Sequence, residues 1–394
     1  MNDFSRDLTD RLAQLRAADL YRELRPVDSP QSPRLQINGP TLLNFSSNDY
    51  LGLANEPSLK KAAKKAVDEF GAGSGASRLV CGSLAPHHRL EESLAEFKGA
   101  DAALSFSSGY ATALGTIGAL LEKGDILIID KLVHACVVDA ARLCGAKLRV
   151  FAHNDLEDLE NILQWATAKA PHARVLIVTE SVFSMDGDLA PLREIIELKD
   201  KYGAWLMLDE AHATGLFGEK RRGLAEAFEL GDRVEIQMGT LGKALGAAGG
   251  YICGSRALID FLINRARSFI FSTAPVPAAA AAAAAGIQFV QSDAGELRRN
   301  HLWARVDQLK NGLIGGPWTL PLVRSAIIPL ILGEEKMALQ MAADLRSLGV
   351  FIPAIRYPTV ARGEARLRLT VTAAHTAADV EQLLTACSQL KSQI

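Results

Sequence analysis

The sequence has few cysteines, no long apolar run and almost no net charge. Its five cysteines form no C-x-x-C pair, which argues against a zinc site or a disulfide framework and favours a reducing compartment. The alanine run over 278–285 is too short to cross a bilayer and suits a buried helix. A net charge of -2 does not indicate the basic surface that binds nucleic acid or an anionic membrane. The polar N-terminus, MNDFSRDLTDRL, contains no secretory signal. We therefore expect a soluble cytoplasmic protein without a metal site.

What the chain does contain is the composition of an ordinary globular protein, with 394 residues of which 48% are hydrophobic and 22% charged. Three parts are expected. Residues 1–56 form an N-terminal segment, with a helix over 5–24 and a short hairpin that turns at Asn38-Gly39. Residues 57–290 form a large domain that binds the ligand. Residues 291–394 form a small α+β domain.

The large domain is predicted to be of the α/β class. Its short apolar runs are nearly continuous rather than alternating, as in strands that are buried on both faces. Helical patterns separate most of them, which predicts a mostly parallel, doubly wound sheet. The seven candidate strands are 102–106, 126–129, 148–151, 175–179, 206–208, 236–238 and 251–253.

Polar side chains follow five of these strands. In open α/β sheets, ligands bind beyond the carboxyl ends of the strands, where helix N-termini also offer N–H groups to a phosphate. Each side chain alone also fits a helix cap or a structural role, but together they predict one binding crevice. The residues are Ser107, Ser108, Gly109, Tyr110, Asp130, His134, Glu180, Ser184, Asp186, Asp188, Asp209, Glu210, His212, Thr240 and Lys243.

Lys243 is the one lysine in a stretch of small residues over 234–254 that has no acidic residue after Glu235. Surroundings poor in charge favour the neutral amine, which is a nucleophile that can form a Schiff base. A surface lysine in a loop is the alternative. A phosphate loop is excluded, because Gln237 stands where the first glycine belongs and Ala244 follows the lysine. The G-x-G-x-x-A match that begins at Gly71 follows a helix rather than a strand, so it is no dinucleotide fingerprint.

The set matches the needs of pyridoxal phosphate, because it contains a lysine, an aspartate at a strand end, a histidine and several hydrogen-bond donors that could hold a phosphate. That cofactor requires an imine to a lysine, an acid beside its pyridine nitrogen and anchors for its phosphate. A nucleotide-binding oxidoreductase on the same sheet and a non-catalytic scaffold remain as rivals. A pyridoxal enzyme would absorb visible light and would lose this absorption in Lys243→Ala, which would distinguish it from both rivals.

Five segments resemble the α-oxoamine synthases, a group of fold-type-I pyridoxal-phosphate-dependent transferases. They are NFSSNDYLGL, TESVFSMDGD, LMLDEAHATG, TLGKALG and RLRLT, and the resemblance covers nearly the whole chain. Three further segments, RAADLYRELRPV, FAHND and RLRLTVTAAH, most resemble the member of biotin biosynthesis that condenses L-alanine with a pimeloyl thioester of CoA or acyl-carrier protein. The alternative is another α-oxoamine synthase that uses glycine or serine with a different acyl-CoA, such as 2-amino-3-ketobutyrate CoA ligase.

The resemblance also implies residue roles. Lys243 would hold the cofactor and act as the base, Asp209 would pair with the ring nitrogen, and His134 would stack on the ring. The remaining cofactor contacts would be Ser184 and His212 near the ring oxygen, Thr240, Gly109 and Tyr110 at the phosphate, and Ser272 and Thr273 at the phosphate of the other subunit of a homodimer. Substrate contacts would be Asn48 and Arg368 for the amino-acid carboxylate and Arg22, Arg356 and Thr359 for the acyl group.

Two features qualify these substrate roles. Arg366 and Arg368 alternate with leucines on a predicted strand, which is typical either of a solvated face or of a carboxylate clamp. The chain departs from the pattern of the family at 360–363, where Arg362 stands in a segment expected to contain a proline and no basic residue.

Overall fold

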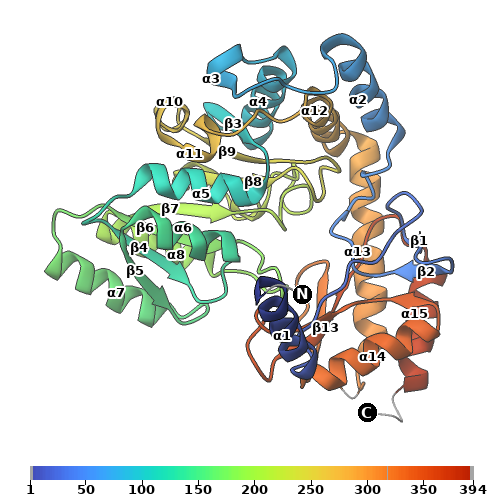
Figure 1. Cartoon of the computed structure of the whole chain (residues 1–394). Coiled ribbons are helices and arrows are strands. Elements are labelled where there is room, and N and C mark those ends of the chain that lie inside the picture. Colours follow the sequence, from blue (N-terminus) through green and yellow to red (C-terminus); the bar gives the residue numbers. More distant parts are fainter. Residues whose placement is uncertain (1–2, 317, 391–394) are drawn as a thin grey trace. The chain divides into compact units, whose positions relative to one another are not determined.

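The computed structural model describes residues 3–316 and 318–390 (Figure 1). The chain forms two compact units. The larger unit comprises Asn48–Ser184 and Asp188–Asn300, and the smaller comprises Met1–Ser47, Met185–Gly187 and His301–Ile394. The predicted division of the chain at residues 56 and 290 stays a prediction.

The larger unit is built on a seven-stranded sheet with the order β3-β9-β8-β7-β6-β4-β5. All neighbouring strands are parallel except at β9, which pairs antiparallel with both β3 and β8. The predicted mostly parallel α/β sheet is therefore confirmed. The strands are β3 (Ala102–Phe106), β4 (Ile126–Asp130), β5 (Lys147–Phe151), β6 (Val175–Glu180), β7 (Trp205–Asp209), β8 (Ile236–Thr240) and β9 (Gly250–Gly254).

Helices cover both faces of this sheet, as Figure 1 shows. One core layer packs the strands against α5 (Gly109–Leu120), α6 (Ala135–Cys144), α10 (Arg256–Arg265) and α11 (Arg267–Ile270). The other packs them against α7 (Leu156–Lys169), α8 (Leu192–Tyr202) and α9 (Leu224–Ala227). Because both faces are covered, the central strands are mostly apolar up to their polar carboxyl ends, and β4 is buried at all five positions.

The alanine run forms the helix α12 (Pro277–Gln291), which packs against α2 (Pro57–Phe70) and α4 (Ala85–Lys98). Gly286 of this helix lies close to the turn between β8 and β9, since a Cβ there would collide with the carbonyl oxygen of Leu245. The short helices α3 (Arg78–Cys81) and η1 (Gly231–Arg233) complete the unit. Within the described residues, no helix combines the length and the apolar character that crossing a membrane requires.

The smaller unit contains two three-stranded sheets. One joins β1 (Arg34–Gln36), β2 (Thr41–Asn44) and β11 (Val350–Phe351), and the other joins β10 (Ile327–Gly333), β13 (Ala365–Thr370) and β12 (Ala354–Ile355). The predicted hairpin is confirmed. Asn38 and Gly39 form its turn with positive φ angles of 52° and 102°, which Asn-Gly pairs adopt readily.

The helices of this unit are α1 (Asp3–Ala17), α14 (Glu335–Ser347) and α15 (Ala377–Leu390), and the boundary between the two units falls within α13 (Asp293–Leu313). The prediction that the first helix extends to residue 24 is wrong. Asp19 adopts a left-handed φ of 56°, and the N–H of Leu20 donates to the carbonyl of Leu15 at 2.8 Å. This closing pattern ends the helix seven residues early.

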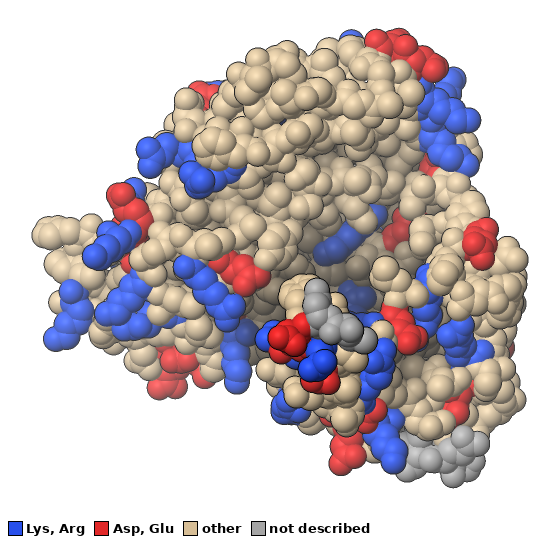
Figure 2. Space-filling view, in the orientation of Figure 1, with Lys and Arg blue, Asp and Glu red and all other residues tan. Residues whose placement is uncertain are grey.

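Charges of both signs are interspersed on the face drawn in Figure 2, with no extended patch of one sign. The upper part of that view, which belongs to the larger unit, is a broad surface with few charges.

Candidate active site

The predicted ligand residues of the larger unit gather at one edge of the seven-stranded sheet. Because β3 and β8 are both antiparallel to β9, β3 runs in the same direction as the parallel strands, so their carboxyl ends share this edge. The last residues of these strands and the segments that follow them include Gly109, Tyr110, His134, Ser184, Asp209, His212, Thr240 and Lys243.

Lys243 lies in the turn between β8 and β9. The Thr240 hydroxyl fixes this turn, because it donates to the carbonyl of Gly249 at 3.0 Å and accepts the N–H of Gly242 at 3.2 Å. The lysine is only partly exposed, and its Nζ lies 2.7 Å from His212 Nε2. The amine is therefore not fully solvated, and the assignment of Lys243 as the cofactor lysine stays a prediction.

His212 connects Lys243 with a residue that sequence reasoning missed. Its second ring nitrogen, Nδ1, lies 2.5 Å from the hydroxyl oxygen of Tyr50. The Tyr50 hydroxyl also lies 3.5 Å from Oδ1 of Asn48. Tyr50 stands in the quoted segment NFSSNDYLGL, but nothing in its spacing indicates a contact 162 residues away.

Asp209 and Glu180 place two carboxyl groups side by side at the ends of β7 and β6. Both are buried. Burial raises the pKa of Asp209, although the charge of Lys243 and the N–H of Ala211, which donates at 2.9 Å, lower it. Burial and the charge of Asp209 raise the pKa of Glu180 to about 8. This edge therefore favours a positively charged partner for Asp209.

His134 caps the N-terminus of α6, where its Nδ1 accepts the N–H of Cys136 at 3.2 Å. Its own backbone N–H donates to Glu180 Oε1 at 2.5 Å, and the backbone N–H of Ser184 also donates to Glu180. His134 is exposed, but desolvation by the neighbouring protein lowers the pKa of its imidazole, which favours the neutral ring near pH 7. A neutral ring suits stacking on a flat ligand.

The N-terminus of α5 also lies at this edge. Ser108 caps the helix by accepting the N–H of Ala111 at 3.0 Å, and Gly109 begins it. A Cβ at Gly250 would lie 2.8 Å from the backbone nitrogen of Gly109, so only glycine fits there. The N–H groups of this first turn and the helix dipole favour a phosphate. Ser272 and Thr273 line a small cavity with Arg78 and Ser107.

In the smaller unit, the structure brings together the three residues predicted to face the acyl group. Arg22 donates to the carbonyl of Tyr357 at 3.4 Å, and Arg356 donates to the carbonyls of Asp19 and Tyr21. The N–H of Thr359 donates to the carbonyl of Arg356 at 2.9 Å. The unexpected Arg362 stacks 4.6 Å from the centre of the Tyr357 ring, so it forms part of the same cluster.

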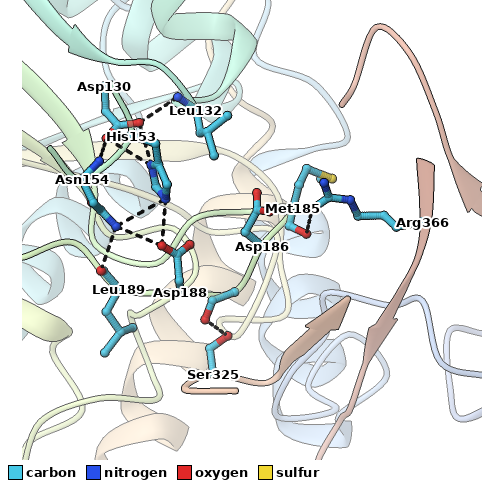
Figure 3. A network of polar contacts seen from close by, with 11 residues as sticks. Asp130, Leu132, His153, Asn154, Met185, Asp186, Asp188, Leu189, Ser325 and Arg366 are labelled. Atoms are coloured by element: carbon cyan, nitrogen blue, oxygen red, sulfur yellow. Dashed lines mark hydrogen bonds and ion pairs between the residues drawn. The ribbon is translucent and has the colours of Figure 1, made fainter. Parts of the chain in front are cut away.

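The interpretation of Arg366 and Arg368 as a solvated face is wrong, because the two residues are 3% and 7% exposed. Arg366 donates to Asp186 at 2.5 Å and to the carbonyl of Met185 at 3.3 Å, which anchors the loop 185–187 (Figure 3). Arg368 donates to the hydroxyl of Thr370 at 2.8 Å. The two arginines therefore have different partners.

A second polar network in the larger unit was also missed. His153 lies between two carboxylates, with Nδ1 3.0 Å from Asp130 and Nε2 2.8 Å from Asp188 (Figure 3). Asn154, at a positive φ of 57°, donates to Asp188 at 2.9 Å. The two carboxylates raise the pKa of His153 to about 10 although burial lowers it. The network joins the ends of β4 and β5 to the loop after Ser184.

The sequence pattern of the family "Aminotransferase class I and II" matches residues 40–386. This chain belongs to that family. Within the family, it is 48% identical over 375 residues to a protein named 8-amino-7-oxononanoate synthase from Anaeromyxobacter dehalogenans, and the match covers 95% of this chain and 93% of the relative.

Two solved structures of this family show the same fold. A serine palmitoyltransferase from S. paucimobilis, bound to a PLP adduct, matches with a TM-score of 0.92 and 28% identity over 100% of both chains. The 8-amino-7-oxononanoate synthase from Francisella tularensis matches with a TM-score of 0.75 and 26% identity over 89% of this chain and 98% of that chain. The predicted fold-type-I transferase fold and the resemblance to the α-oxoamine synthases are confirmed.

Proposed function

We propose that this chain is a pyridoxal-phosphate-dependent acyltransferase that condenses L-alanine with a pimeloyl thioester to form 8-amino-7-oxononanoate, CO₂ and free thiol, a step of biotin biosynthesis. The observation that carries the proposal is the half-buried amine of Lys243, held by His212 at a sheet edge that also bears Asp209. The extensive identity to proteins named 8-amino-7-oxononanoate synthase supports this product over those of the sister enzymes.

The residues at this edge fit pyridoxal phosphate. Lys243 would hold the aldehyde carbon, Asp209 would pair with the ring nitrogen, and neutral His134 would stack on the ring. The first turn of α5, with Thr240, would hold the phosphate, and Ser184 and His212 would lie near the ring oxygen. When bound, the group supplies an electron sink for the carbanion that forms at the α-carbon of alanine.

The residues of the chain perform the remaining work. Lys243 Nζ would take the α-proton of alanine and later return a proton to the product. The alanine carboxylate would be held by Asn48 and Arg368 and would leave as CO₂. The thioester would be bound by Arg22, Arg356 and Thr359, and its thiol would be the leaving group. Guanidinium groups bind carboxylates in two-point contacts, which suits both substrates.

The active form is proposed to be a homodimer. The amphipathic α1 has no buried residue, and its exposed Phe4, Leu8, Leu12 and Leu15 follow one another at helical spacing. A helix of this length gains little stability without a partner for its apolar face. In the larger unit, Phe271 beside Ser272 is also exposed. A second copy would cover these surfaces and receive Ser272 and Thr273 at its phosphate.

A cytoplasmic location is proposed as well. None of the five cysteines forms a disulfide in the described residues, which supports a reducing compartment.

The test is an assay of the purified protein with pimeloyl-CoA and, separately, pimeloyl-acyl-carrier protein. Each thioester is offered with L-alanine, glycine or L-serine, and CO₂ and thiol release are measured. We expect visible absorption of the protein as isolated, its loss in Lys243→Ala, and turnover with L-alanine. Faster turnover with glycine or serine would assign the chain to a sister activity. A colourless protein that takes up no pyridoxal phosphate would refute the proposal.

A further inference from the structure

Tyr50 lies one residue beyond direct contact with Lys243. Its hydroxyl contacts Nδ1 of His212, whose Nε2 contacts Lys243 Nζ. Tyr50 and His212 are 1% and 5% exposed, so the contact between them is buried, and the contact between His212 and Lys243 is partly buried. We propose that Tyr50 is a positioning residue that acts through His212 and sets the pH at which Lys243 becomes a neutral, nucleophilic amine.

In its charged form, Lys243 can only donate a hydrogen bond to His212. An ammonium group has only donors, so His212 Nε2 must accept. The neutral imidazole then carries its proton on Nδ1, and that N–H needs an acceptor. The Tyr50 oxygen, 2.5 Å away, is that acceptor, and the hydroxyl proton is left to point toward Asn48 Oδ1 at 3.5 Å.

In its neutral form, the Lys243 amine also carries a lone pair. Its lone pair can accept a hydrogen bond from Nε2–H, in which case the imidazole is the other tautomer and Nδ1 is the acceptor. The Tyr50 hydroxyl then turns and donates to Nδ1. One proton leaves Lys243 for solvent, and neither His212 nor Tyr50 changes its charge. A hydroxyl is the group that serves both states, because it can donate and accept.

Removal of the hydroxyl has unequal effects on the two states. In Tyr50→Phe, the ammonium state loses the hydroxyl oxygen as acceptor for the buried Nδ1–H, whereas the neutral state loses only a donor to the Nδ1 lone pair. Buried donors without partners are the rarer and more costly of the two. The variant should therefore disfavour the ammonium and lower the midpoint of Lys243 titration by about one pH unit, a tenfold change in the equilibrium.

The inference deepens the proposed function, because it concerns the amine that would hold the cofactor, but its test needs no turnover. The full-length protein is stripped of pyridoxal phosphate by dialysis against hydroxylamine and labelled with trace acetic anhydride over a range of pH. Peptide mass spectrometry follows the acetylation of Lys243, with the exposed Lys64 as the internal reference. The extent of acetylation reports the fraction of neutral amine.

Tyr251→Phe is the matched control. Tyr251 is as buried as Tyr50, but its hydroxyl contacts Thr214 at 3.0 Å. We expect a lower midpoint in Tyr50→Phe and an unchanged one in Tyr251→Phe. In a His212→Asn background, Tyr50→Phe should cause no further change. An unchanged or higher midpoint in Tyr50→Phe, or an equal shift in Tyr251→Phe, would overturn the proposal.

Two further measurements keep the outcome decisive. If Tyr50→Phe does not fold, 3-fluorotyrosine at position 50 retains the ring and the hydroxyl but weakens the oxygen as an acceptor. A smaller downward shift is then expected, and no shift would count against the inference. Uptake of pyridoxal phosphate by the wild-type protein is recorded separately, so that failure of the proposed function is not mistaken for failure of this inference.

Discussion

Glu180 of β6 is paired in register with Asp209 of β7, so two buried carboxyl groups lie next to each other at the carboxyl ends of these strands. Like charges in a buried pair disfavour ionisation of both groups. The pKa of Glu180 is raised to about 8, first by burial and then by the charge of Asp209. Near pH 7, Glu180 is therefore mainly protonated, which leaves Asp209 as the group that would carry the negative charge.

The first prediction is a pH-dependent effect of Glu180→Gln. The folded-state pKa of Glu180, about 8, is above its ordinary value of 4.5, so the folded chain binds this proton more tightly than the unfolded chain between these pH values. The contribution of Glu180 to stability is therefore present below pH 4.5 and is lost as pH rises through 8. Glutamine does not titrate, so the free energy of unfolding of the variant should fall less between pH 5 and pH 8.

Urea denaturation of the cofactor-free protein at the two pH values measures this difference. Glu197→Gln, at an exposed position on α8, is the control and should follow the wild type. Parallel pH dependence in all three proteins would show that Glu180 does not titrate in this window.

The strands and Lys243 could be predicted from the sequence because their signals are local. Buried parallel strands are nearly continuous apolar runs, and Lys243 stands in a stretch with few local partners. The contact between Tyr50 and His212 gives no local signal, because the two residues are far apart in the chain. Such partners are fixed by the topology of the sheet.

Two local patterns misled the prediction for physical reasons. The alternation of Arg366 and Arg368 with leucines is typical of a strand with one solvated face, but all six residues of β13 are buried. The arginines are tolerated there because Asp186, Glu364 and Thr370 supply partners. The leucine spacing in the first helix could not show its end, since a left-handed residue at Asp19 decides it.

A second prediction concerns the buried pair of Lys98 and Glu210, whose side chains are each 1% exposed. Lys98 Nζ contacts Glu210 Oε2 and donates to the carbonyl of Arg222 at 2.5 Å. Lys98→Met leaves the Glu210 charge buried without its partner and should cost about 3–5 kcal/mol of unfolding free energy. The double variant Lys98→Met/Glu210→Gln should cost less than the sum of the two single changes.

Lys65 and Glu69 provide the comparison, because they form an exposed pair on α2 with a distance of 3.6 Å. Lys65→Met should change stability by about 0.5 kcal/mol or less. Chemical denaturation measures all four variants. Equal losses in Lys98→Met and Lys65→Met would contradict the assignment of a structural role to the buried pair.

The third prediction is a pH-dependent role of His153. The carboxylates of Asp130 and Asp188 raise its pKa to about 10 from an ordinary 6.5. For a base with a raised pKa, the stabilisation is complete below pH 6.5 and is lost as pH rises through 10. His153→Gln should therefore lower the free energy of unfolding strongly at pH 6 and much less at pH 10.

Denaturant titrations at the two pH values give this comparison. His172→Gln, at an exposed position, is the matched control and should have little effect at either pH. A loss of stability in His153→Gln that does not depend on pH would indicate that packing on Phe183, 4.4 Å between ring centres, is the main contribution of this residue.

The last prediction separates the two buried arginines of β13 and rests on the proposed function. Arg368→Lys keeps the charge but loses the fork that binds a carboxylate at two points. We expect the KM for L-alanine to rise at least about tenfold, which corresponds to about 1.4 kcal/mol, while the KM for the pimeloyl thioester stays unchanged. Arg366→Lys loses contacts with Asp186 and the carbonyl of Met185, so it should lower the melting temperature instead. Steady-state kinetics and thermal denaturation of both variants distinguish the roles, because a carboxylate ligand affects substrate affinity whereas a loop anchor affects stability. If both variants changed only stability, Arg368 would be a structural residue, and the amino-acid carboxylate would need another partner.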